Sequence, residues 1–86
     1  MKEFSYTVKS EHGMHARPCG LLCNTAKKFD SECSVTYEGR TANAKRLISV
    51  MGLGIKQGGV MHFKIDGSDE SEAERALIEC LEEHLK

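Results

Sequence analysis

The chain has 86 residues, which is enough for one small hydrophobic core, so we expect a single domain over residues 1–86. Hydrophobic residues make up 40% and charged residues 29%, as in an ordinary globular protein. Twelve basic and thirteen acidic residues give a net charge of −1, which argues against binding to nucleic acid or an anionic membrane. No apolar run approaches the ~20 residues of a membrane span, and the first residues do not resemble a signal peptide. We therefore expect a cytoplasmic protein.

The first third of the chain predicts a strand followed by a helix. Residues 3–9 alternate between apolar and polar side chains, which is typical of a strand with one buried face. A turn over residues 11–13 follows, and the apolar spacing then changes to i, i+3, i+4, i+7. Pro18 fits a helix only in its first turn, so this helix should begin near His15 or Ala16 and end by Phe29. Its buried stripe is Cys19, Leu22, Cys23 and Ala26.

The remaining residues predict three more strands and two more helices. Alternation indicates a strand over residues 33–37, and Glu38-Gly39 makes a turn into a strand over 40–43. A short helix over 46–51 and a strand over 61–65 follow. Asp69 should cap the last helix, with Glu72 completing a capping box. The apolar face of that helix is Ala73, Ala76, Leu77, Cys80, Leu81 and Leu85.

This order, βαββαβα, predicts the α+β class. A four-stranded antiparallel sheet would carry three helices on one face, giving an open-faced two-layer sandwich. The four cysteines are Cys19, Cys23, Cys33 and Cys80. Without a signal sequence we expect reduced thiols that behave as small buried apolar residues.

The run from His12 to Pro18 (HGMHARP) places His15 at the start of the first helix and Arg17 just after it. A helix N-terminus presents unpaired N–H groups and the positive end of the macrodipole, so it favours a bound anion. Arginine adds a planar fork of donors suited to phosphate oxygens. A neutral imidazole beside such donors is the minimum apparatus for accepting a phosphoryl group. The tetrapeptide His15-Ala16-Arg17-Pro18 alone is also compatible with a polar helix start without function.

The run Gly13–Pro18 resembles the active-site signature of the HPr family, the histidine phosphocarriers of the bacterial sugar phosphotransferase system. The length, the element order, Asn43-Ala44-Lys45 and the run 50–55 are also similar to that family. The resemblance implies a phosphocarrier rather than an enzyme, without a cofactor. Its partners would be enzyme I, which donates the phosphoryl group, and sugar-specific enzyme IIA domains, which accept it.

The same resemblance implies a role for particular residues. His15 would carry the phosphoryl group on Nδ1, and Arg17 and the backbone N–H groups of Ala16 and Arg17 would hold its oxygens. The family docks its partners through an apolar patch, which by position is Gly20, Leu47, Ile48 and Met51. The alternative is that the last three fill the core. We expect a monomer.

Two positions depart from the family. Arg46 stands where many relatives have a regulatory serine, so control by an HPr kinase should be absent at this position. Ser49 lies nearly one turn further along. His12 stands where a small polar residue is usual, and it is either a solvated turn residue or a further contact to the phosphoryl group.

Other functions compete with the sugar pathway. A paralogous HPr-like protein of a nitrogen-type or glycerone-kinase-type relay would have the same signature. A metal-binding module is suggested by the pattern H-x2-H-x3-C-x3-C, formed by His12, His15, Cys19 and Cys23. Cys19, close to a helix N-terminus, is also a candidate for thiol redox chemistry.

Overall fold

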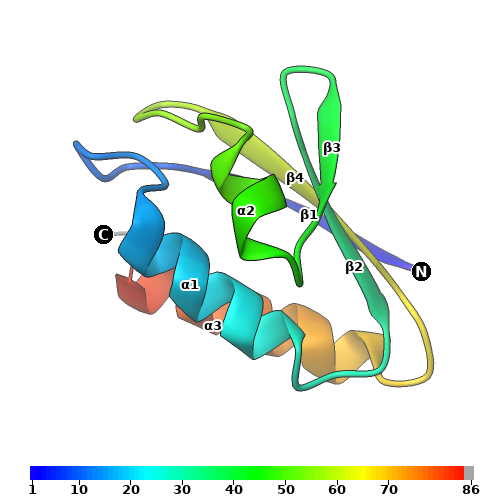
Figure 1. Cartoon of the computed structure of the whole chain (residues 1–86). Coiled ribbons are helices and arrows are strands. Elements are labelled where there is room, and N and C mark those ends of the chain that lie inside the picture. The colour runs from blue at the N-terminus through cyan, green and yellow to red at the C-terminus, as the bar shows by residue number, and fades with distance from the viewer. Residues whose placement is uncertain (85–86) are drawn as a thin grey trace.

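The computed structural model describes residues 1–84 and contains two layers, a β-sheet and three helices (Figure 1). The elements in chain order are β1 (Lys2–Thr7), α1 (Ala16–Ala26), β2 (Glu32–Tyr37), β3 (Arg40–Asn43), α2 (Leu47–Met51), β4 (Val60–Asp66) and α3 (Glu70–His84). Figure 1 shows α1 and α3 lying alongside each other on one face of the sheet, with the smaller α2 on the same side. The predicted α+β class and element order are confirmed.

The sheet is antiparallel throughout, and its strand order is β1-β4-β2-β3. Phe63 in β4 lies opposite Phe4 on one side and Val35 on the other. Alternate residues of each strand face the helices, so the inward face is apolar and the outward face is polar. The outward face therefore remains open to solvent, as the alternation predicts.

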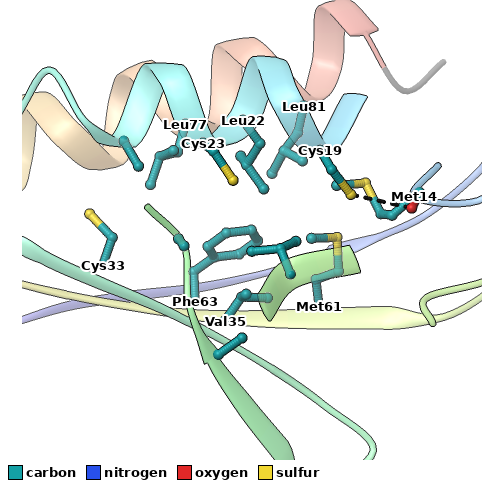
Figure 2. Packing of buried hydrophobic residues seen from close by; sticks show 14 of the residues in the cluster. Met14, Cys19, Leu22, Cys23, Cys33, Val35, Met61, Phe63, Leu77 and Leu81 are labelled. Carbon is teal, nitrogen blue, oxygen red and sulfur yellow. Dashed lines mark hydrogen bonds between the residues drawn. The ribbon is translucent and has the colours of Figure 1, made fainter. Parts of the chain in front are cut away.

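The core lies between this inward face and the helices (Figure 2). Phe63 is fully buried at its centre, and its ring stacks on Phe4 with the two centroids 4.7 Å apart. Leu22 from α1 and Leu77 from α3 meet it from the helical layer. The other large side chains buried to the same degree are Met61, Ile65, Leu81, Val8, Val35, Val50, Cys19 and Cys23. All four cysteines are free and buried, which confirms their role as small core residues.

The predicted boundaries differ from the structure by one to three residues. The first strand ends at Thr7 rather than at residue 9, because Val8 bonds through its N–H and C=O to the loop residues Gly59 and Gly58. α1 begins at Ala16, as Pro18 in the first turn requires. Its last regular residue is Ala26, and hydrogen-bonded turns continue to Phe29.

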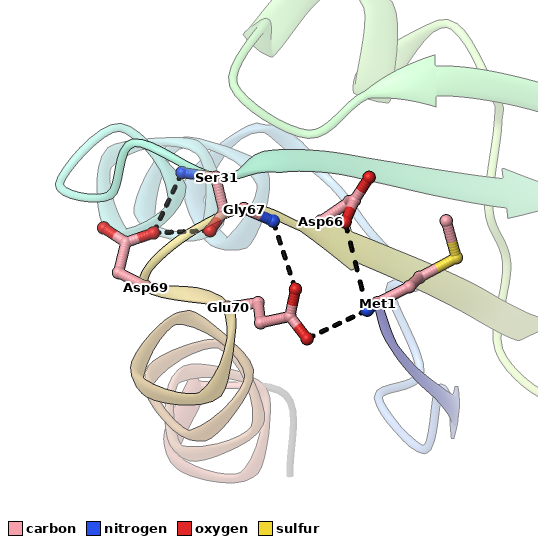
Figure 3. A network of polar contacts seen from close by, with 6 residues as sticks. All are labelled: Met1, Ser31, Asp66, Gly67, Asp69 and Glu70. Carbon is pink, nitrogen blue, oxygen red and sulfur yellow. Dashed lines mark hydrogen bonds and ion pairs between the residues drawn. The ribbon is translucent and has the colours of Figure 1, made fainter.

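Asp69 precedes the first residue of α3, as predicted, and its carbonyl accepts the Ala73 N–H, but the predicted capping box with Glu72 is wrong. The Asp69 carboxylate turns away from α3 and accepts hydrogen bonds from the Ser31 N–H (2.9 Å) and the Ser31 hydroxyl (Figure 3). It also accepts the Asp30 N–H at 2.8 Å. Glu70, instead of Glu72, reaches back and accepts from the Gly67 N–H at 3.2 Å. Asp69 therefore ties the start of α3 to the connection between α1 and β2. The predicted apolar residue Leu85 lies outside the described residues.

Candidate functional site

His15 is the residue that precedes α1, and its side chain is exposed. Its backbone is extended (φ −80°, ψ −176°), and its carbonyl accepts the Cys19 N–H at 3.2 Å, which is the first bond of the helix. Pro18 is buried in the first turn, where no N–H is needed. The exposed imidazole therefore lies at the N-terminus of the helix.

The first turn of α1 offers donors that the described part of the chain does not use. The N–H groups of Ala16 and Arg17 point out of the helix end, where helix geometry provides no carbonyl acceptor. No side chain of residues 1–84 caps this end, and the turn contains no acidic residue. Ala16 and Arg17 are both exposed. Uncapped N–H groups and the positive end of the helix dipole are the features by which helix N-termini bind tetrahedral anions, and both are present next to His15.

A second loop holds this helix start in place. The Met14 N–H donates to the Ile55 carbonyl at 3.0 Å, and the Met14 side chain is buried. Gly13, at φ +63°, makes this approach possible, because a Cβ atom there would lie 2.5 Å from the Ile55 oxygen. The Gly13 N–H also donates to the Ser10 carbonyl. His15 is thus positioned by two loops that are distant in sequence.

His12 and His15 are brought together by the turn before α1. Their ring centroids lie 5.9 Å apart, with the rings edge to face at 89°. Both side chains are exposed, and the His12 N–H donates to the Ser10 hydroxyl at 3.3 Å. A group attached to the His15 ring would therefore lie close to a second imidazole.

An apolar patch lies on α2, which contacts α1. Leu47 is 37% exposed, Ile48 80% and Met51 39%, while Val50 alone in this helix points into the core. The core-filling alternative for the first three residues is therefore wrong, and we call them the α2 patch. On α1, a Cβ atom at Gly20 would meet no other atom within 4 Å, so the surface there is open.

Arg40 fixes the end of α2. Its guanidinium donates to the carbonyl of Leu53 at 2.6 Å and to that of Gly52 at 3.4 Å. These carbonyls follow the helix directly, where a cation also complements the negative end of the dipole. Sequence reasoning missed the positioning residues Arg40 and Ile55. A basic residue after a tight turn is common on surfaces, and a backbone acceptor has no signature in the sequence.

The cysteines and histidines of the pattern H-x2-H-x3-C-x3-C do not converge. The Cys19 thiol donates to the Met14 carbonyl at 3.2 Å and Cys23 lies in the core, whereas His12 and His15 are exposed. Burial raises the pKa of Cys19 to about 11, which also argues against a reactive thiolate there. Within residues 1–84, no group of three or more His, Cys, Asp or Glu residues is placed to hold a metal ion. No helix in this part is long and apolar enough to cross a membrane.

Comparison with known proteins identifies the family. The model described as "PTS HPr component phosphorylation site" matches residues 2–83. The structure is similar to a Mycoplasma histidine-containing phosphocarrier protein (TM-score 0.94, 29% identity, covering 95% of this chain and 93% of that one). It is also similar to HPr of Thermoanaerobacter tengcongensis, with a TM-score of 0.90 and 40% identity over 95% of this chain and 92% of that one. A third similar structure is the Bacillus subtilis catabolite repression protein Crh, described as a domain-swapped dimer. Its TM-score is 0.75, with 28% identity over 100% of this chain and 99% of that one. The chain therefore belongs to the HPr family of phosphocarrier proteins of the phosphotransferase system.

Proposed function

We propose that His15 is the residue that carries the phosphoryl group. It receives the group from phosphorylated enzyme I and passes it to a histidine of an enzyme IIA domain. A bond forms between phosphorus and Nδ1 of His15 as the bond to the donor breaks, and the second transfer reverses this at the acceptor. The observation that carries the proposal is the exposed imidazole at a helix N-terminus whose first N–H groups are uncapped.

The first turn of α1 supports the transfer electrostatically. The phosphoryl oxygens become acceptors for the N–H groups of Ala16 and Arg17, and the exposed Arg17 guanidinium adds charge-assisted hydrogen bonds. We include His12 among the phosphate contacts, because its ring lies edge-on to that of His15. The protein is the substrate of the first transfer and the donor in the second, which regenerates it. It therefore acts as a carrier and not as a turnover catalyst.

The α2 patch and Gly20 form the docking surface for both partners. Leaving Ile48 80% exposed is unfavourable unless a partner covers it, because fully burying such a side chain is worth about 1.5–3 kcal/mol. Ile48→Ser should therefore raise the enzyme I concentration needed for half-maximal transfer by about tenfold. The matched control is Val60→Ser, since Val60 is 51% exposed on the open face of the sheet. Equal effects of the two variants would contradict the docking role.

Because Arg46 precedes α2, the start of this helix has no serine that a kinase could phosphorylate. Arg46 occupies the position before Leu47, with extended backbone (φ −112°, ψ 109°), and its side chain has no hydroxyl. Ser49 is exposed but lies inside the helix. Incubation with an HPr kinase and ATP should add no mass, and a phosphate on Ser49 would refute this expectation.

The test of the proposal is the intact mass of the protein after incubation with enzyme I and phosphoenolpyruvate. One added phosphate that mild acid removes is the expected result for phosphohistidine. His15→Gln should abolish it, and Arg17→Gln should slow it. His84→Gln replaces another exposed histidine and should leave it unchanged. Failure to take up phosphate would favour a relay with another donor, or a protein that acts by docking alone. The same samples in sedimentation experiments test the expected monomer.

A further inference from the structure

Three polar side chains form a connected row on the open face of the sheet, away from the helices and from His15. The Ser5 hydroxyl lies 2.9 Å from Nδ1 of His62, its cross-strand neighbour in β4. Nε2 of the same ring lies 3.0 Å from Oε1 of Glu3. The His62 and Glu3 side chains are 41% and 49% exposed, and Ser5 is exposed. A nucleophile, a base and a carboxylate are thus joined in the order that activates a serine.

The hydrogen bonds determine where the protons are in the neutral form of this row. The Glu3 carboxylate only accepts, so Nε2 of His62 carries the hydrogen that it receives. Nδ1 is then the acceptor, and the Ser5 O–H donates to it. The hydrogen bond from His62 and the nearby Lys64 lower the pKa of Glu3, so it stays ionised. Thr36 is the neighbour of His62 in β2, but its hydroxyl is hydrogen-bonded to the hydroxyl of Thr41. Nδ1 of His62 is bonded to Ser5 instead.

We propose that Ser5 is a second covalent acceptor on this protein, which takes an acyl group from small activated esters with His62 as general base. The Ser5 oxygen attacks the carbonyl carbon and gives its proton to Nδ1 of His62. The bond from the carbonyl carbon to the leaving oxygen breaks, and that oxygen takes the proton from His62. Ser5 then holds the acyl group as an ester, and one alcohol or phenol is released. Glu3 is a positioning residue that maintains the tautomer of His62.

The site lacks a feature that efficient acyl-transfer enzymes have. Backbone N–H groups of a sheet lie in its plane, so in the described structure no pair of them is aimed above Ser5 at a developing oxyanion. Losing such donors costs about 10²–10³ in rate. Acylation should therefore require a good leaving group, and hydrolysis of the product ester should be slow. We expect one acyl group per chain and no sustained turnover.

The experiment uses p-nitrophenyl acetate at neutral pH, with release of p-nitrophenol and mass mapping of the tryptic peptide Glu3–Lys9. The expected result is one acetyl group on Ser5, absent in Ser5→Ala. His62→Gln should slow the reaction by about a hundredfold or more, which is the range of general base catalysis. Thr36→Ala is the matched control, because it removes a hydroxyl beside His62 that is not bonded to the ring. It should react as fast as the unmodified protein.

Glu3→Gln tests the positioning role separately. It should slow acetylation and change its dependence on pH, while thermal unfolding followed by circular dichroism shows that the exposed-face variants remain folded. Acetylation of Ser5 at the same rate without His62, or no preference for Ser5 over the exposed Ser71, would overturn the proposal. Phosphoryl transfer at His15 is measured independently, so either proposal can fail without the other.

Discussion

Replacing Gly13 with alanine should destabilise the protein more than the same replacement at Gly54. Both glycines have nearly the same left-handed backbone, at φ +63° and φ +66°. Their surroundings differ, because a Cβ atom at Gly13 would lie 2.5 Å from the Ile55 oxygen and 2.9 Å from Cα of Lys56. A Cβ atom at Gly54 would meet nothing within 4 Å. The comparison therefore isolates the close approach of the two loops at the site.

The expected magnitudes follow from these contacts. An alanine in the left-handed region costs about 1 kcal/mol, which is the whole penalty at Gly54. At Gly13 the new atom would overlap backbone, which cannot swing away, so the loops must separate. The bond from the Met14 N–H to the Ile55 carbonyl would then be lost, at about 1–3 kcal/mol for buried groups left without partners. The total at Gly13 is about 2–4 kcal/mol, and the melting temperature should fall by roughly 10–25 °C, against about 5 °C for Gly54→Ala.

Thermal unfolding followed by circular dichroism measures both variants under the same conditions. Gly13→Ala should also slow phosphoryl uptake from enzyme I at a temperature where it is still folded, because His15 is two residues away. Equal losses of stability in the two variants would show that the loops move apart without cost. That result would refute the view that the contact with Ile55 positions the site.

The other predictions concern a carboxylate, a thiol and a guanidinium. Hydrogen bonds from Ser31 lower the pKa of Asp69. The ionised Asp69 carboxylate therefore stabilises the folded protein fully above the ordinary carboxyl pKa of about 4, and this stabilisation is lost as the pH falls through the lowered pKa. Asp69→Asn should therefore reduce the urea midpoint at pH 7 and flatten the loss of stability at acidic pH. At pH 8 a thiol with a pKa of about 11 is only about 0.1% thiolate, so Cys19 should react with iodoacetamide more than 100-fold slower than an ordinary cysteine. Arg40→Gln frees the Leu53 carbonyl, and it should raise the enzyme I concentration for half-maximal transfer several-fold.

Each of these has its own control. Asp69→Asn must be compared with the unmodified protein at every pH, because the pKa of Glu70 is lowered as well. Rapid alkylation of the folded protein at Cys19, as fast as in denaturant, would mean that the thiol is accessible. Arg40→Lys retains the charge and should restore part of the docking, whereas an unchanged half-maximal concentration in Arg40→Gln would show that α2 does not need this contact.

The elements could be predicted because their signals are local. Alternation in the strands, the spacing of Cys19, Leu22, Cys23 and Ala26, and the turn at Glu38-Gly39 each act over a few residues. The position of His15 before α1 also followed locally, from Pro18. The capping box was predicted wrongly because the Asp69 carboxylate accepts hydrogen bonds from the N–H groups of residues 30 and 31. These tertiary contacts override the local preference for capping.

The site was only partly predictable for the same reason. The Ile55 carbonyl reaches Met14 across 41 positions of the chain, and Ser5 meets His62 across 57. Neither pair has a spacing that a sequence reveals, because the register of β1 and β4 decides the Ser5–His62 contact and the packing of two loops decides the Met14–Ile55 contact. The sequence alone also left open whether Ile48 is exposed or buried, because an apolar residue in a short helix is compatible with either.

The position of β4 has a consequence for the synthesis of the protein. This strand is the last of the four to leave the ribosome, yet it lies between β1 and β2 and pairs with both. Until residues 60–66 have emerged, β1 has no neighbour and α1 has no complete surface on which to pack. Closing such long loops is slow compared with forming local contacts. A nascent chain should therefore be unable to fix the start of α1, and with it His15, before residues 60–66 have emerged.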